Sequence, residues 1–156
     1  MQFLADLMLK KLCRWLRILG VSTLYAGDFR IREDDELIKL ALKKKAVLLT
    51  RDEKLFNKAR DYAQVLLIKS IYLSKQLKQV LKEFKIKTNF PEKTLCPQCN
   101  SRLKQVGKKV VKQKVFPAVY KAHSIFWVCI NKQCGKVYWQ GSHWKKIETV
   151  INKIMQ

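Results

Sequence analysis

The chain has 156 residues, of which 48% are hydrophobic, so it is long enough for one domain or two small ones with a buried core. It lacks both a run of about 18 apolar residues and a signal-peptide pattern, which excludes a membrane span and leads us to expect a cytoplasmic protein. Its formal net charge of +21 predicts a polyanionic partner, most simply nucleic acid.

The positive charge is concentrated in the second part of the chain. Residues 1–61 carry a net charge of +5, whereas residues 62–156 carry +16 with only three acidic residues. A thermophilic surface rich in Lys would also be rich in Glu, and Glu is scarce here. An acidic membrane surface is disfavoured because the chain has no lipidation motif.

In the first part of the chain, short apolar runs alternate with amphipathic segments. We predict strands over residues 2–6, 21–26, 46–49 and 64–68, and a helix after each of them, over residues 7–19, 33–45, 53–62 and 73–84. Strands that alternate with helices form parallel sheets with right-handed crossovers. We therefore expect an α/β domain over residues 1–90, with a mostly parallel four-stranded sheet.

The first predicted helix carries two stripes of different character. Apolar side chains recur at helical spacing and should face the core: Met8, Leu9, Leu12, Leu16 and Leu19. Lys10, Arg14 and Arg17 follow an i, i+4, i+7 course on another face. This basic stripe is either a solvated helix face or a surface that contacts phosphate groups.

The chain after residue 90 has a different pattern, with β-prone segments over residues 106–116, 125–128 and 136–139 and a terminal helix over residues 144–155. Four cysteines follow the spacing C-x2-C, 29 residues, C-x4-C: Cys96, Cys99, Cys129 and Cys134. Two such knuckles complete a tetrahedral thiolate site for structural zinc. We therefore predict a four-cysteine zinc ribbon with a C-terminal helix over residues 91–156.

Acidic side chains should gather at one edge of the predicted sheet. Asp6 follows the first strand and Asp52 the third, while Asp34 and Asp35 begin the helix after the second. Carboxylates about 5 Å apart repel by roughly 3 kcal/mol at an effective dielectric constant of about 20, so a cluster needs a cation such as Mg²⁺ or Mn²⁺. One hypothesis is a metal-dependent phosphodiesterase centre. The alternative is that these acids only cap helices.

Four segments of the chain resemble the Mut-seven C-terminal RNase-domain family, a PIN-like nuclease group with an appended zinc ribbon: FLADLMLKKLCRWLRILG, DDELIKLALKKKAVLLTRD, CPQCN and YWQGSHW. They occur in the same order as in the family and span nearly the whole chain. The resemblance implies a PIN-like α/β/α fold and metal-dependent cleavage of RNA.

The resemblance also assigns roles to individual residues. It gives Asp6, Asp35 and Asp52 as the acids that bind Mg²⁺ or Mn²⁺ and catalyse, with Asp34 competing with Asp35 for the second position. Thr50 would steady the turn that carries Asp52. On the first helix, the basic stripe would position the RNA backbone.

The chain departs from the family pattern at a few positions. Lys10 and Cys13 stand where the family often has Gly and Ala, and a fourth acid is not evident because Asp61 is the only acid between Glu53 and Glu83. Two other functions are also compatible with the sequence. The chain could be a non-catalytic nucleic-acid-binding module, or it could tether a protein partner that the sequence does not identify.

Overall fold

A computed structural model describes residues 1–88 and 90–155 of the chain. The chain divides into two compact units, Met1–Asn100 and Ser101–Gln156. The first unit thus extends past residue 90, where the sequence placed the boundary, and it includes Cys96 and Cys99.

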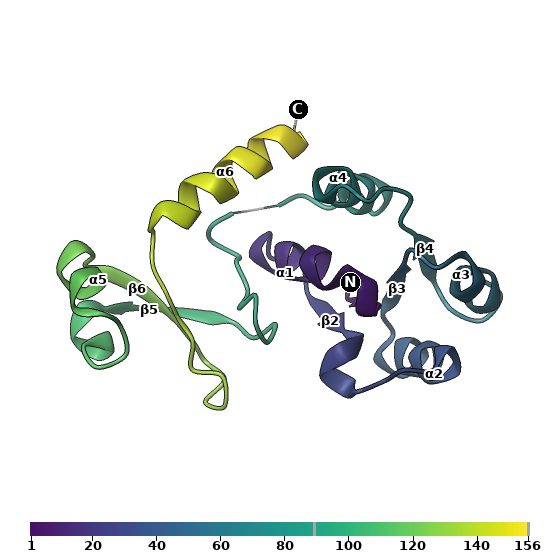
Figure 1. Ribbon diagram of the computed structural model, residues 1–156, viewed down its shortest axis with the longest axis horizontal. Helices are drawn as coiled ribbons and strands as arrows, with labels where there is room; N and C mark the ends of the chain where they lie inside the picture. The colour runs from purple at the N-terminus through teal and green to yellow at the C-terminus, as the bar shows by residue number, and fades with distance from the viewer. Residues whose placement is uncertain (89, 156) are drawn as a thin grey trace. The chain divides into compact units, whose positions relative to one another are not determined.

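The first unit is built on a parallel sheet of four strands (Figure 1). The strands are β1 (Phe3–Ala5), β2 (Thr23–Tyr25), β3 (Val47–Thr50) and β4 (Val65–Leu67), and their order is β2-β1-β3-β4. From β1 the chain passes to β2 on one side, then crosses to β3 on the other side of β1. The carboxyl ends of β1 and β3 therefore form a topological switch point, where ligands of open parallel sheets bind.

Helices cover both faces of this sheet. They are η1 (Leu7–Leu9), α1 (Lys10–Ile18), η2 (Ala26–Phe29), α2 (Asp34–Lys44), α3 (Glu53–Ala59) and α4 (Leu73–Glu83). Helices α1 and α4 lie on one side and α2 and α3 on the other (Figure 1). The alternating side chains of β1 serve both layers, because Phe3 contacts Phe84 just after α4 with ring centroids 5.0 Å apart, whereas Leu4 joins the core that α2 and α3 cover. The predicted α/β fold with a four-stranded parallel sheet is confirmed.

The segment after β1 begins with a 3-10 turn before it becomes α-helical. The predicted core positions Leu9, Leu12, Leu16 and Leu19 are buried, but Met8 is exposed. A 3-10 turn has about three residues per turn, so it shifts the helical phase and places Met8 off the buried stripe. The predicted inward position of Met8 is therefore wrong.

The second unit contains an antiparallel sheet of β5 (Leu103–Gly107), β6 (Ile125–Cys129) and β7 (Val137–Tyr138), in that order. Its helices are η3 (Lys108–Val111), α5 (Pro117–Ala122) and α6 (Ser142–Met155). The β-prone segment predicted over residues 106–116 is wrong beyond Gly107, the last residue that pairs with β6. Tertiary packing overrides strand propensity here, since Val111 turns into the core from η3.

No helix in the described part of the chain combines the length and the apolar character needed to cross a bilayer.

Candidate active site and metal centre

Asp6 lies directly after β1, where it is only 5% exposed. Its Oδ1 accepts a hydrogen bond from the backbone N–H of Met8 at 3.0 Å, and its Oδ2 accepts one from the hydroxyl of Thr50. Burial raises the pKa of Asp6, and these hydrogen bonds oppose the rise in part. Asp6 is therefore a helix cap, as the alternative interpretation held.

Thr50 joins Asp6 to the end of the neighbouring strand. Its Oγ1 donates to Asp6 and accepts from the backbone N–H of Asp52 at 2.9 Å. Thr50 is fully buried, whereas Asp52 is exposed. We call this arrangement the Asp6–Thr50–Asp52 bridge, and it spans the switch point between β1 and β3.

Asp52 caps helix α3. Its Oδ1 accepts from the backbone N–H groups of Lys54 at 2.7 Å and Leu55 at 3.1 Å. Both bonds go to one carboxylate oxygen, and the other oxygen, Oδ2, forms no hydrogen bond within the described residues. An exposed oxygen at the edge of the sheet is suited to a metal ion.

Asp35 does not join this bridge. It is exposed in the first turn of α2, and its Oδ1 forms an ion pair with Lys58 Nζ at 2.8 Å. The hydrogen bond from Lys58 holds the pKa of Asp35 below its usual value. Asp34 is half-buried. Of the two acids that compete for the second metal-binding position, only Asp35 is therefore held in the ion pair with Lys58. Lys58 has no sequence motif that would have marked it.

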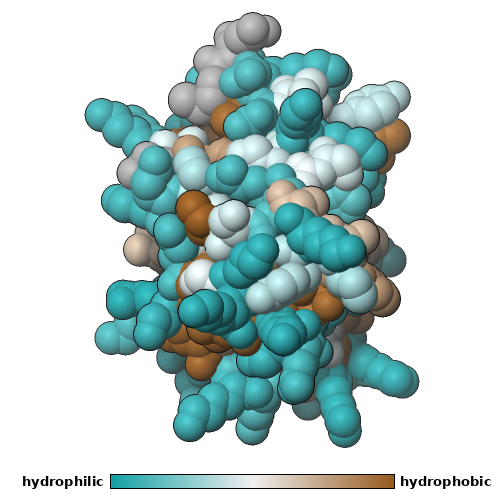
Figure 2. All heavy atoms as spheres, turned by 90° about the vertical axis from the view of Figure 1, so that its left-hand side faces the viewer, coloured by the Kyte–Doolittle hydropathy of each residue, from teal (hydrophilic) through white to brown (hydrophobic). Residues whose placement is uncertain are grey.

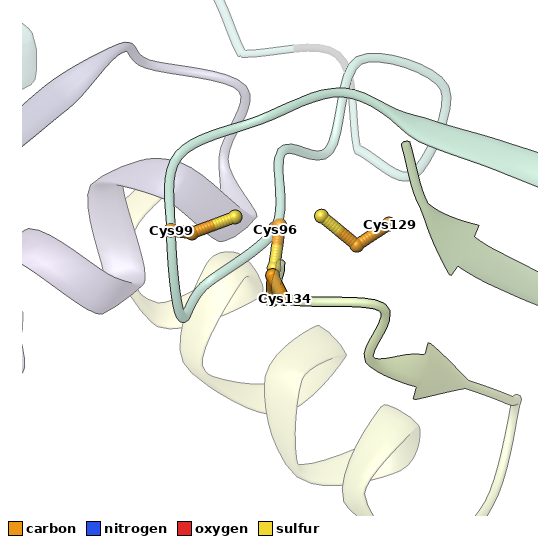
Figure 3. A group of neighbouring side chains, drawn as sticks. All are labelled: Cys96, Cys99, Cys129 and Cys134. Carbon is orange, nitrogen blue, oxygen red and sulfur yellow. The ribbon is translucent and has the colours of Figure 1, made fainter. Parts of the chain in front are cut away.

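Four cysteine thiols gather in one group, Cys96, Cys99, Cys129 and Cys134, with sulfur atoms within 4.8 Å of one another (Figure 3). Across residues 1–88 and 90–155 it is the one group of three or more Cys, His, Asp or Glu placed to hold a metal ion, so the three predicted aspartates do not form a ready-made cage. Four thiolates in a tetrahedral set are typical of structural zinc and leave no open coordination position. The predicted ligand set is thus brought together as a metal site.

Each knuckle ends in a left-handed residue directly after its second cysteine. Asn100 has φ 68° and follows Cys99, while Gly135 has φ 55° and follows Cys134. The first turn is closed by the Asn100 N–H, which donates to the carbonyl of Cys96 at 2.9 Å. In the wider knuckle, Asn131 closes the turn, because its carbonyl accepts from the N–H groups of Cys134 and Gly135 at 3.0 and 2.8 Å. The extra residues of the C-x4-C spacing therefore form a turn of their own.

Arg17 has a different role from the one that its position on the basic stripe indicated. It is only 3% exposed, its Nε donates to the carbonyl of Thr23 at 2.8 Å, and its Nη1 donates to the carbonyls of Pro97 and Gln98, both at 3.0 Å. Its Nη2 lies 3.6 Å from Asp28 Oδ2. The guanidinium thus holds the backbone of the first cysteine knuckle, and it is not placed to contact a substrate.

Replacement of Arg17 by Met should destabilise the protein by about 3 kcal/mol, because three carbonyls lose hydrogen bonds to a charged donor. The melting temperature and the zinc content should both fall. Arg14→Met is the matched control, since Arg14 is exposed on the same helix. Equal melting temperatures for Arg17→Met and Arg14→Met would contradict the anchoring role of Arg17.

Lys10 and Arg14, the other two members of the stripe, are exposed. Lys10 Nζ lies 5.6 Å from the ring centroid of Tyr25, the last residue of β2. The Tyr25 hydroxyl in turn donates to the carbonyl of Leu7 at 3.1 Å. Lys10 is therefore held at the same edge of the sheet as Asp6.

A family model described as the Mut7-C RNAse domain matches residues 1–151. No curated protein and no solved structure matches the chain.

Proposed function

The chain belongs to the Mut7-C RNAse domain family, and from this premise we propose that it is a metal-dependent ribonuclease with its reaction centre at the carboxyl ends of β1 and β3. The observation that carries the proposal is the Asp6–Thr50–Asp52 bridge. It places a buried carboxylate and an exposed one at the switch point, in a chain with a net charge of +21.

The donor set at this edge fits Mg²⁺ or Mn²⁺ bound by Asp6 and Asp52. Mg²⁺ is commonly held by one or two carboxylates together with water and substrate phosphate, so a cage of three acids is not required. When bound, such an ion lowers the pKa of a coordinated water and offsets negative charge on the phosphate. Thr50 orients the Asp6 carboxylate and fixes the Asp52 turn at the same time.

The substrate backbone would meet Lys10 and Arg14, the exposed members of the basic stripe. The second unit adds charge, with twelve Lys and Arg against one acidic residue, Glu148, in residues 101–156. This charge supports sequence-independent binding of RNA phosphates. We assign zinc to the four cysteines and give it a structural role only, because a site of four thiolates is closed.

Incubation of labelled single-stranded RNA with the protein tests this function directly. Cleavage should require added Mn²⁺ or Mg²⁺ and should disappear in Asp6→Asn at unchanged zinc content. Asp61→Asn is the matched control, since Asp61 is an exposed acid outside the bridge and should leave cleavage intact. Tight, salt-sensitive binding with no cleavage under either metal would overturn the proposal.

Separate replacement of Asp34 and Asp35 tests which of these two acids of α2 takes part in cleavage. We expect Asp34→Asn to reduce cleavage by about tenfold or more, because Asp34 is not occupied by the Lys58 ion pair. Asp35→Asn should have a smaller effect on the cleavage rate. The reverse order would mean that Lys58 releases Asp35 when RNA or metal binds.

One observation favours a second candidate function, a non-catalytic nucleic-acid-binding protein. The ion pair between Asp35 and Lys58 keeps one predicted ligand away from the bridge. If this state persists with RNA bound, the chain would bind RNA through its basic surface without cleaving it. The cleavage assay above separates the two functions.

A further inference from the structure

The loop after β4 displays two large apolar side chains to solvent, Ile71 at 65% and Tyr72 at 62% exposure. We propose that Tyr72 is a base-stacking site for single-stranded RNA, which holds a nucleotide beside the one at the reaction centre. This inference rests on the proposed function for the position of that centre.

The loop begins at the bridge. The backbone N–H of Ile68 donates to the carbonyl of Thr50 at 2.7 Å, and Leu67 pairs in register with Thr50. Neighbouring strands lie about 5 Å apart, so the end of β4 is about 5 Å from the end of β3 and about 10 Å from that of β1. A nucleotide chain that passes Asp6 and Asp52 along this edge would next meet the loop.

Two glutamines of α4 fix the loop backbone. Gln79 donates to the carbonyl of Leu67 at 2.8 Å and accepts from the backbone N–H of Lys69 at 3.1 Å. Gln76, itself buried, donates to the carbonyl of Ser70 at 2.9 Å. The exposure of the two apolar side chains is therefore a property of a pinned loop.

A nucleobase is the ligand that suits this surface. Its flat face matches an exposed aromatic ring, and such stacking contributes about 1–3 kcal/mol per base. Lys75 Nζ lies 5.6 Å from the centroid of the Tyr72 ring and can neutralise a phosphate of the same nucleotide. Bases in a duplex are already stacked on one another, so the site selects single strands.

Two tryptophan rings of the second unit, Trp127 and Trp144, are less suited to this task. Trp127 and Trp144 are half-buried and stack on each other, with ring centroids 5.7 Å apart. The face that Figure 2 shows, on the side of α5 and β6, is dominated by hydrophilic side chains with small apolar patches between them. The excess of Lys and Arg suits this unit to sequence-independent binding of the RNA backbone.

The test compares binding of a fluorescent oligoadenylate and of an abasic oligonucleotide of equal length, without added Mg²⁺ or Mn²⁺ so that no cleavage occurs. Tyr72→Ala should weaken oligoadenylate binding by about 5- to 150-fold and leave abasic binding unchanged. Tyr72→Phe, which keeps the ring, should bind like the wild type. Tyr62→Ala is the matched control, since Tyr62 is 74% exposed but precedes β4 at the opposite edge of the sheet.

Wild-type affinity in Tyr72→Ala would overturn the stacking site, as would an equal loss in Tyr62→Ala or an equal loss on the abasic strand. The result is separable from the proposed function because it does not depend on cleavage. A wild type that never cuts RNA, yet shows the Tyr72 dependence, would refute the nuclease and keep the stacking site. A wild type that cleaves RNA, together with a Tyr72→Ala variant that binds oligoadenylate as tightly as wild type, would keep the nuclease and refute the stacking site.

Discussion

Cys134→Ser should abolish zinc binding and unfold the second unit. This unit has a small core, since the buried hydrophobic residues described in it are four: Val111, Phe126, Cys129 and Ile154. Structural zinc contributes about 10–16 kcal/mol in zinc-finger peptides, which is as much as the whole stability of many domains. Cys134 is half-buried, so its own packing is a minor part of the loss.

Zinc content and tryptophan fluorescence measure the two parts of this prediction. Wild type should hold about one zinc per chain, and Trp127, Trp139 and Trp144 should become exposed to water in Cys134→Ser. Cys13→Ala is the matched control. Burial raises the pKa of the Cys13 thiol to about 11, and its Sγ donates to the carbonyl of Thr23 at 3.6 Å, so it is no zinc ligand. Zinc retained in Cys134→Ser, or none in wild type, would contradict the site.

Asp6→Asn should lose about 100-fold or more of the cleavage rate and yet be more stable than wild type at neutral pH without Mg²⁺ or Mn²⁺. Asparagine keeps the size of Asp6 and an oxygen for the N–H of Met8. It removes a carboxylate that burial makes costly to ionise. Loss of function with gain of stability is the expected sign of a group retained for chemistry.

The pH dependence of this stability difference has a defined sign. The pKa of Asp6 is raised in the folded protein, so protonation of Asp6 stabilises the fold at pH values below the ordinary pKa of an Asp. This stabilisation is lost as the pH rises through the pKa that Asp6 has in the folded protein. The melting temperature of Asp6→Asn should thus exceed that of wild type by a margin that grows from pH 4 to pH 7. Asp61→Asn, at an exposed position, should show no such growth. A melting temperature for Asp6→Asn below that of wild type across this range would show that the carboxylate stabilises the fold.

The order of strands and helices in the first unit could be predicted because its signals are local. Apolar runs and amphipathic periods mark β1, β3 and α4 without reference to the rest of the chain. The same holds for the four cysteines, whose spacing fixes the chemistry of the site. The strand prediction over residues 106–116 failed because strand propensity is local, whereas strand formation depends on pairing with β6, and that pairing ends at Gly107.

The environment of each site residue could not be predicted in the same way. Arg17 has the spacing of a surface stripe, and only the fold shows that its guanidinium meets the carbonyls of Pro97 and Gln98, far away in the sequence. The partner of Asp35 is likewise set by how α3 packs beside α2, which brings Lys58 within 2.8 Å. The helical period predicts on which face of a helix a residue lies, but the tertiary fold determines which residues that face contacts.

Anomalous scattering from a crystal soaked in Mn²⁺ tests the proposed reaction centre most directly. We predict a manganese peak at the switch point, about 2.1 Å from carboxylate oxygens of Asp6 and Asp52, and no such peak in Asp6→Asn. A peak confined to other acids, or an empty edge at saturating Mn²⁺ with the zinc site filled, would contradict a metal centre built on the Asp6–Thr50–Asp52 bridge.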